Sequence, residues 1–383
     1  MDSWWRNKKT MKNILILKFP YSSLYGGGER NTIIIVEELL KKGFNFFLVT
    51  SCKVLLREFR KRHWHHQKLW AGIEPVSKGA LLIFPFLAPF IFIELFIVLF
   101  YYRFWKKTTI LYCLSLTEKL LMALPARILG YRVYWSEHVT FERWLSLNPW
   151  RFLYRWFSSL VQIIAISRVI RDQLVQMGIK ESQIKVIYNG IDLNLFKMKE
   201  VYWDHPERFI VGVVARLEKE KGIEFLLKAV KIVQEFIPNV RAIIVGEGPE
   251  RKKLEWLGNQ LGLKEKIQWV GYQENIEKWY HYFDVLVLPS AKRESFGNVL
   301  IEAMASGVPV IASKIGGTSE IIDYKINGLL AKPGDTQDLA DKIIYLYNNR
   351  SENKQMIKKA REKVEKMFSL ERMIRDFYLL FRR

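Results

Sequence analysis

The segment around residue 300 constrains the fold most strongly, because it alternates between strand, turn, helix and strand. Residues 285–289 form a branched apolar run, which is typical of a buried parallel strand. A polar turn follows, and apolar residues then recur at helical spacing until Gly307 and Pro309 end the helix. A second apolar strand covers residues 308–312. The pattern predicts a βαβ unit whose turn lies at a helix N-terminus, an arrangement that binds anions.

Two glutamates flank this turn and its helix, Glu294 in the turn and Glu302 within the helix. Because a carboxylate repels a phosphate, we expect both side chains to face neutral hydroxyl groups. Glu302 suits a ribose, as the acidic residue of dinucleotide-binding folds does. Glu294 suits a second polyol or a developing positive charge. The alternative is that both are solvated surface acids that interact favourably with the helix dipole.

Length and composition set the class of protein. The chain has 383 residues, which is too many for one ordinary core and predicts about two domains of Rossmann size. Half of the residues are hydrophobic, which excludes a disordered chain. Cys52 and Cys113 are the only cysteines, so we expect a reducing compartment and neither a disulfide framework nor a cysteine-rich metal site. The polar, basic stretch from Asp2 to Lys12 does not resemble a cleavable signal.

Positive charge is concentrated in the first half of the chain. The net charge is +21; residues 1–195 carry 28 Lys and Arg against 13 Asp and Glu, a net +15. Such a surplus indicates nucleic acid, anionic lipid or an anionic substrate. No nucleic-acid reading module is recognisable. A basic surface beside aromatic and aliphatic residues fits a membrane surface better.

The run Ala80–Tyr102 is apolar and long enough to cross a bilayer, although Pro85, Pro89 and Glu94 interrupt it. A crossing would separate strands that belong to one sheet, because predicted strands lie on both sides of the run. We therefore expect one or two helices within segment 80–105 to lie in the membrane interface, with Arg103, Lys106 and Lys107 at the phosphate level. The alternative is a buried helix pair of the domain.

Strands and helices alternate along the whole chain. The expected strands of the first half are residues 13–17, 44–50, 109–114, 133–138, 163–167 and 184–187, and those of the second half begin at residues 209, 240, 267, 284 and 308. Regular alternation predicts parallel sheets covered by helices. In such α/β folds, ligands bind at the carboxyl ends of the strands.

Candidate binding residues of the first half follow two of these strands. Gly27 and Gly28 belong to a glycine-rich turn, which permits close approach of the backbone to an anion but is equally typical of a plain tight turn. His138 ends the strand 133–138, and a lone histidine is more often structural. Three histidines at positions 63, 65 and 66 offer a metal site, but histidines in a basic aromatic stretch are more often surface residues, and no carboxylate ligands lie nearby in sequence.

The second half places two cations at a strand end and a helix start, Arg216 and Lys221. Paired cations at such a position favour a diphosphate over a merely charged surface. Gly246 lies in a further glycine turn after the strand 240–245. Tyr272 follows the strand 267–270, where the backbone and the ring are placed to hold a base.

Several motifs occur in an order and spacing that resembles the family 4 glycosyltransferases, from about Lys12 to the end of the chain. They are GGGER at 26–30, EH at 137–138, YNGID at 188–192, ARLEKEKG at 215–222, VGEGP at 245–249 and the E-x7-E pattern at 294–302. The resemblance implies the GT-B fold, an α/β architecture of two Rossmann-like domains whose parallel sheets face a central cleft. It divides the chain into an acceptor-binding domain (1–192), a nucleotide-sugar-binding domain (193–365) and a C-terminal helix (366–383) that crosses back to the first domain.

The resemblance also implies a reaction, the transfer of a sugar from a nucleotide diphosphate donor with retention at the anomeric carbon. Neither a metal nor a cofactor is expected. The catalytic residues it implies are Glu294, His138, Arg216 and Lys221. The expected nucleotide-sugar-binding residues are Gly27, Gly28, Arg216, Lys221, Gly246, Tyr272, Ser295, Phe296, Gly297, Asn298 and Glu302.

The acceptor is less constrained by the sequence. The basic, apolar first half indicates a saccharide or lipid-linked acceptor in surface glycan synthesis, at the cytoplasmic face of the cell membrane. Two alternatives remain, and the first of them can share the fold. A nucleotide-sugar epimerase would act without an acceptor and without a lipid-facing domain. A non-catalytic nucleotide-binding protein would more often lack Glu294, Arg216 or Lys221, and all three are present.

Overall fold

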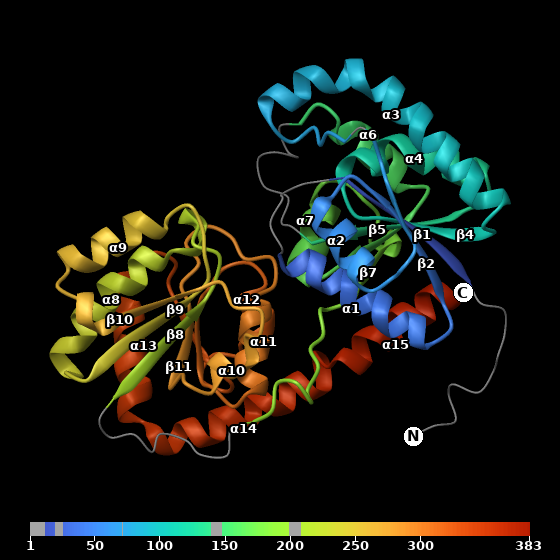
Figure 1. Cartoon of the computed structure of the whole chain (residues 1–383). Coiled ribbons are helices and arrows are strands. Elements are labelled where there is room, and N and C mark those ends of the chain that lie inside the picture. The colour runs from blue at the N-terminus through green and yellow to red at the C-terminus, as the bar shows by residue number, and fades with distance from the viewer. Residues whose placement is uncertain (1–11, 20–25, 71, 139–147, 199–207) are drawn as a thin grey trace. The chain divides into compact units, whose positions relative to one another are not determined.

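The computed structural model describes residues 12–19, 26–70, 72–138, 148–198 and 208–383. The chain folds into two compact units (Figure 1). The first comprises Met1–Tyr188 and Ile374–Arg383, and the second comprises Asn189–Met373. The boundary lies four residues before the expected end of the first domain. The last helix, α15 (Leu370–Arg382), belongs to the first unit from Ile374 onward.

The described residues of the first unit form a seven-stranded sheet in the order β3-β2-β1-β4-β5-β6-β7. All neighbouring strands are parallel, as the alternation of strands and helices predicts. The strands are β1 (Asn13–Lys18), β2 (Asn45–Thr50), β3 (His66–Lys68), β4 (Thr108–Cys113), β5 (Arg132–Glu137), β6 (Gln162–Ala165) and β7 (Ile184–Val186). The short β3 was not predicted, because its residues are polar and two of its three side chains are exposed at the sheet edge.

Helices connect these strands, and α15 packs on the same unit. Their bounds are α1 (Gly27–Lys41), α2 (Lys53–Lys61), α3 (Lys78–Phe104), α4 (Leu116–Ile128), α6 (Arg151–Ser158) and α7 (Arg168–Gln176). The Tyr134 hydroxyl donates to the Leu380 carbonyl at 3.0 Å, and Phe44 lies edge-on to Tyr378. These contacts fix the end of the chain against β2 and β5.

The apolar run forms one continuous helix, α3, of 27 residues. Pro85 and Pro89 lie inside it and do not break it, although each removes one backbone hydrogen bond. One stripe of α3 is buried, and its members Phe84, Ile91, Leu95, Val98, Leu99 and Tyr102 recur at helical spacing. This stripe faces the unit, and α3 packs on α4 and β4. The helix is therefore the crossover connection between β3 and β4.

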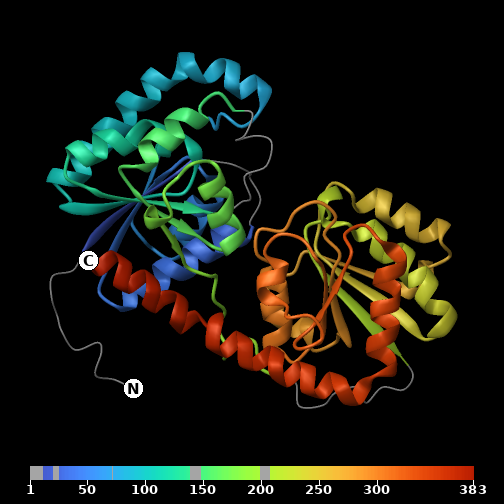
Figure 2. The same cartoon turned by 180° about the vertical axis from the view of Figure 1, so that it is seen from behind.

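The opposite stripe of α3 is exposed and also apolar. Leu82, Phe86 and Phe90 are 74%, 77% and 70% exposed. Ile93, Ile97 and Phe104 continue the stripe. Both views place α3 along the outside of α4 and α6 (Figures 1 and 2), and α6 adds exposed Phe152 and Trp156. By length and composition, the helix over residues 79–104 is long and apolar enough to cross a membrane. Of its most apolar stretch of 18 residues, 22% is buried inside the protein.

The second unit contains a six-stranded parallel sheet in the order β10-β9-β8-β11-β12-β13. The strands are β8 (Phe209–Val214), β9 (Val240–Val245), β10 (Ile267–Gly271), β11 (Val285–Leu288), β12 (Val310–Ser313) and β13 (Leu329–Ala331). The helices are α8 (Ile223–Phe236), α9 (Arg251–Gln260), α10 (Glu277–Tyr280), α11 (Asn298–Ala305), α12 (Thr318–Ile321), α13 (Thr336–Asn348) and α14 (Arg350–Met367).

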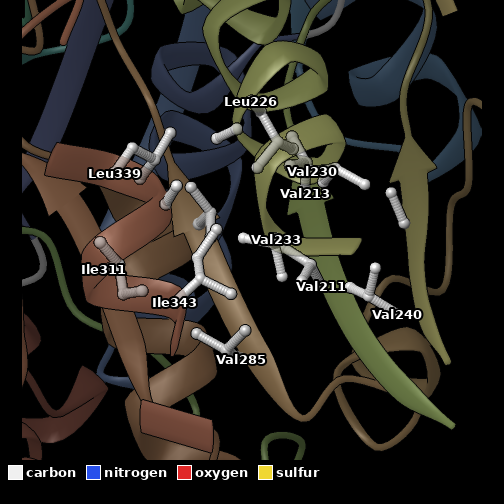
Figure 3. Close-up of a cluster of buried hydrophobic side chains, with 14 of the residues drawn as sticks. Val211, Val213, Leu226, Val230, Val233, Val240, Val285, Ile311, Leu339 and Ile343 are labelled. Atoms are coloured by element: carbon white, nitrogen blue, oxygen red, sulfur yellow. The ribbon is translucent and has the colours of Figure 1, made fainter. Parts of the chain in front are cut away.

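The core of the second unit lies between one face of this sheet and the helices α8 and α13. Val211, Val213, Val285 and Ile311 from the strands meet Leu226, Val230, Leu339 and Ile343 from the helices (Figure 3). Because strand side chains alternate between faces, Leu286 and Leu288 point to the other face, where α11 packs. The helix α11 is thus fixed beside β11 and β12.

Candidate active site

Most of the predicted site residues of the second unit lie at one edge of its sheet. Arg216 follows β8, Gly246 follows β9, Tyr272 follows β10 and Glu294 lies in the loop after β11. Since these strands are parallel, their carboxyl ends meet at the same edge. Residues 295–297 lead from this edge into the N-terminus of α11, with Gly297 as its N-cap. The sheet therefore collects residues that are up to 81 positions apart, from Arg216 to Gly297.

Glycines allow these loops to pack closely. Gly222 has a left-handed backbone and starts α8, and a Cβ atom there would lie 2.1 Å from the Pro289 carbonyl oxygen. A Cβ atom at Gly316 would lie 2.0 Å from the Glu294 carbonyl oxygen, which accepts the Gly317 N–H at 2.8 Å. No side chain fits in either place, so glycine is required for the loop carrying Glu294 to rest on its neighbours.

Lys221 and Glu294 form an ion pair at the centre of this edge. The distance from Lys221 Nζ to Glu294 Oε2 is 2.7 Å, and the Ser290 hydroxyl donates to the same oxygen at 2.9 Å. Both side chains are largely buried. Arg216 is more exposed and pairs with Glu218 at 2.9 Å. The edge thus presents two cations, and one of them is held by the glutamate of the E-x7-E pattern.

Glu302 is buried in α11 and accepts a hydrogen bond from the Tyr280 hydroxyl at 2.6 Å. The contact orients the carboxylate within the helix. Asn298, the first residue of α11, accepts a hydrogen bond from the Asn189 amide at 2.9 Å. The ring of Phe296 packs edge-on against Phe368. The N-terminal end of α11 therefore contacts residues near both ends of the second unit, Asn189–Met373.

In the first unit, a second group of polar residues lies at the carboxyl edge of the sheet. Lys18 ends β1, and its ammonium contacts Glu29 in the first turn of α1 at 2.6 Å. The other carboxylate oxygen of Glu29 accepts the Gly26 N–H at 3.2 Å, so Glu29 caps the helix. Gly27 is exposed and Gly28 is partly buried in the same turn.

His138 follows β5 and lies beside this turn. Its Nε2 atom is 2.9 Å from the Ser136 hydroxyl. Burial, together with the positive charges of Lys18 and Lys119, lowers the pKa of His138 to about 3, and the Glu29 carboxylate opposes this shift. The imidazole is therefore neutral at physiological pH and can exchange hydrogen bonds with an uncharged ligand.

Buried polar side chains contact Glu137, the residue before His138 at this edge of the first sheet. Lys119 contacts Glu137 at 2.5 Å, and the Tyr154 hydroxyl donates to the same carboxylate oxygen at 2.7 Å. Glu74 and Glu118 are also buried, and both accept backbone N–H groups near the start of α4. Burial raises the pKa of both carboxyl groups, to about 8 for Glu74, where the neighbouring Glu118 carboxylate adds to the shift.

The predicted site residues thus form two groups. Gly27, Gly28 and His138 lie together in the first unit, and the remaining predicted residues belong to the second unit. Sequence reasoning missed Lys18, Glu29 and Tyr280. Lys18 is the last residue of the apolar strand β1, and Arg216 lies two residues after the end of β8. A basic residue at the end of an apolar strand was therefore the available sequence signal for Lys18. No sequence signal identifies Tyr280, because its role depends on packing against α11. In the described part of the chain, no three His, Cys, Asp or Glu side chains gather as a metal site would require.

Two family models match the chain one after the other. Residues 25–195 match the model described as Glycosyltransferase Family 4, and residues 198–363 match Glycosyl transferases group 1. The chain belongs to the family 4 glycosyltransferases. The motifs that indicated this family at GGGER, EH and E-x7-E all lie within the matched regions, so the predicted family membership is confirmed.

Relatives in this family agree with the assignment. An uncharacterized glycosyltransferase of Methanocaldococcus jannaschii is 34% identical over 213 residues, covering 49% of this chain and 54% of the relative. The amylovoran biosynthesis glycosyltransferase AmsK of Erwinia amylovora is 30% identical over 222 residues, covering 56% and 54%. The chain spans about half the length of the curated relatives it matches.

The fold is that of the GT-B glycosyltransferases. The crystal structure of Anabaena HepE in complex with UDP superposes with a TM-score of 0.79 and covers 97% of this chain and 99% of HepE, at 21% identity. The match extends over both sheets of this chain. It confirms the predicted fold class.

Proposed function

We propose that the protein transfers a sugar from a nucleotide diphosphate donor to a glycan acceptor, with retention at the anomeric carbon and without a metal or cofactor. The observation that carries this proposal is the carboxyl edge of the second sheet, where Lys221 pairs with Glu294 in the loop before α11 and Arg216 follows the neighbouring strand β8. Cations and a helix N-terminus stabilise the negative charge that develops on a departing diphosphate.

Each predicted site residue of the second unit takes a part in donor binding. Arg216 and Lys221 bind the diphosphate, together with the turn of residues 295–298. The diphosphate then replaces Glu294 as the partner of Lys221, and the released carboxylate faces the sugar, where it supports positive charge at the anomeric carbon. Glu302 holds the ribose. Gly246 permits close approach of the base, and Tyr272 lies alongside it.

The first unit contributes the residues beside the transferred sugar. His138 is neutral and offers hydrogen bonds to the sugar, and the turn of Gly27 and Gly28 lets the backbone approach the donor phosphate and the acceptor. No separate base is assigned. The departing phosphate takes the acceptor's proton on the same face of the sugar, which accounts for retention.

The acceptor is a saccharide or lipid-linked saccharide, used at the cytoplasmic membrane face in glycan synthesis. The exposed stripe of α3 supports this part of the proposal, because a water-exposed apolar surface of this length is unfavourable in a soluble monomer. We infer that α3 lies in the plane of the interface rather than across it, since its buried stripe packs on α4 within one parallel sheet unit. AmsK, a similar chain, is named for amylovoran biosynthesis.

Lys106 and Lys107 are exposed at the end of α3, and we propose that they meet lipid phosphates. Arg103 contributes differently from what the sequence predicts. Its Nε donates to the Leu129 carbonyl at 2.8 Å, and its guanidinium lies over the Tyr131 ring. Arg103 therefore anchors α3 to the domain.

Calorimetric titration of the protein with UDP and with GDP, each in excess EDTA, tests the donor site. Micromolar binding of one nucleotide is expected. Lys221→Ala is expected to lower turnover of the matching nucleotide sugar at least about tenfold, because the cation acts mainly on the developing charge. Absence of binding to both nucleotides without metal would contradict the metal-independent site. Release of an epimerised nucleotide sugar without an acceptor would favour the epimerase alternative.

A further inference from the structure

Lys18 and Glu29 form a buried ion pair at the edge of the first sheet, and the donor site of the second unit does not account for it. Both residues are less than 10% exposed. Their atoms Nζ and Oε1 are 2.6 Å apart. Burying two charges is costly unless they are paired and well bonded. A buried pair beside candidate site residues therefore calls for a functional explanation.

Glu29 uses its two oxygens for different partners. Oε1 accepts from Lys18, and Oε2 accepts from the Gly26 N–H at 3.2 Å. Burial alone would raise the pKa of Glu29, but the Lys18 charge and the Gly26 contact lower it below its ordinary value. The charged carboxylate thereby connects the end of β1 to the first turn of α1.

That first turn lies against His138. A Cβ atom added at Gly28 would be 3.8 Å from His138 Cγ, which is an ordinary van der Waals distance. The groups that face His138 are Lys18 from β1, Lys119 from α4 and Glu29 from α1. Two positive charges and one negative charge therefore surround the imidazole, and the Lys18–Glu29 pair supplies one of each.

We propose that Lys18 and Glu29 are positioning residues, whose ion pair holds the glycine turn of α1 against His138 and keeps this imidazole uncharged during sugar transfer. The proposal rests on the role given to His138 in the proposed function. Lys18 acts on the ring through its charge, and Glu29 acts through the helix turn. Neither residue needs to touch the sugar.

The test compares Lys18→Met, Lys18→Arg and Glu29→Gln in the full chain, with Lys41→Met as the matched control. Lys41 pairs with Glu38 at 2.5 Å on the exposed surface of the same helix. The titration of His138 is followed between pH 4.5 and 8 by NMR of the histidine Cε1–H groups, with the His138 signal identified by its loss in His138→Gln. Hydrolysis of UDP-glucose over the same pH range is the second readout.

In the wild type, the Lys41→Met control and Lys18→Arg, the His138 signal is expected to stay constant across this range. In Lys18→Met, its midpoint is expected to rise from about 3 into this pH range, and hydrolysis is expected to fall at least tenfold with a new loss at acidic pH. Glu29→Gln keeps the Lys18 charge, so His138 stays neutral while hydrolysis falls at all pH values. If Lys18→Met does not fold, the Glu29→Gln and Lys18→Arg results decide.

An unchanged His138 titration in Lys18→Met overturns the proposal, as does full hydrolysis by Glu29→Gln. A wild-type protein that does not hydrolyse UDP-glucose counts against this nucleotide sugar as the donor, whereas the proposed function names only a nucleotide diphosphate sugar. The NMR titration still decides the inference in that case, since it requires no turnover.

Discussion

At the scale of single residues, Tyr280 gives a sharp test of the role proposed for Glu302. Its hydroxyl donates to the Glu302 carboxylate at 2.6 Å, and both side chains are buried. Removing this hydrogen bond leaves the carboxylate less well oriented toward a ribose. We expect Tyr280→Phe to weaken UDP binding by about 1 kcal/mol, roughly fivefold, in calorimetric titration. Tyr282→Phe alters an exposed ring nearby and should leave the affinity unchanged. Equal affinities for all three proteins would count against Glu302 as a nucleotide ligand.

The buried carboxyl pair of Glu74 and Glu118 predicts a pH dependence of stability. Burial and the Glu118 charge raise the pKa of Glu74 from its ordinary 4.5 to about 8. A raised folded-state pKa contributes stability that is present below pH 4.5 and is lost as the pH rises through 8. Glu118→Gln removes one charge, and its amide oxygen can still accept the Ser115 N–H.

We therefore expect the thermal midpoint of Glu118→Gln, relative to wild type, to be higher at pH 8.5 than at pH 5. The difference corresponds to roughly 1–3 kcal/mol. The exposed substitution Glu37→Gln is the control and should show no such pH dependence. A constant difference between Glu118→Gln and wild type across this range would show that the two carboxyl groups do not interact.

At the scale of elements, apolar runs and their spacing were sufficient to predict most strands and helices of both units. The prediction failed where packing, and not pattern, decides the structure. The polar strand β3 exists because its backbone pairs with β2, and nothing in His66–Lys68 signals this. The prolines in α3 suggested an interruption, yet the helix continues because its buried stripe packs along the unit.

The exposed stripe of α3 predicts binding to lipid vesicles. Phe86 and Phe90 are 77% and 70% exposed, and their insertion into the interface contributes about 1.5 kcal/mol or more each. The double substitution Phe86→Asp and Phe90→Asp should lower the vesicle partition coefficient about a hundredfold in co-sedimentation. Trp256→Asp changes an aromatic residue of α9 that is 63% exposed and should have no effect. Unaltered partitioning of the double variant would indicate that protein, rather than lipid, covers α3.

At the scale of the whole molecule, the order of motifs predicted two Rossmann-like units and the sheet edges at which site residues gather. The sequence alone could not reveal how those residues contact one another. Lys221 and Glu294 are 73 positions apart, and both were expected to face a ligand, whereas the structure pairs them. Their contact depends on Gly222 and Gly316, which let the loops approach more closely than any other residue would permit. Propensity and spacing do not encode such distances.

The uneven charge of the molecule predicts how membrane binding responds to salt. Residues 1–195 carry a net +15, and Lys106 and Lys107 are exposed beside the apolar stripe of α3. Each basic residue near an anionic surface contributes about 1 kcal/mol, and salt shortens the screening distance from about 10 Å at 0.1 M to about 3 Å at 1 M. Binding to anionic vesicles should therefore fall more than tenfold over this range, and binding to neutral vesicles should change little.

Substitutions of the lysines and of the phenylalanines separate the electrostatic contribution to vesicle binding from the apolar contribution. Lys106→Gln with Lys107→Gln should reduce the salt dependence without affecting binding to neutral vesicles, whereas the uncharged substitutions Phe86→Ser with Phe90→Ser should do the reverse. Insertion of α3 into lipid requires its apolar stripe, whereas attraction to anionic lipid requires only that Lys106 and Lys107 lie close to the surface. Independent effects of the two pairs of substitutions would therefore support an α3 that lies in the interface with its lysines at the lipid phosphates. A salt dependence equal for neutral and anionic vesicles would contradict an electrostatic contribution from the first half of the chain.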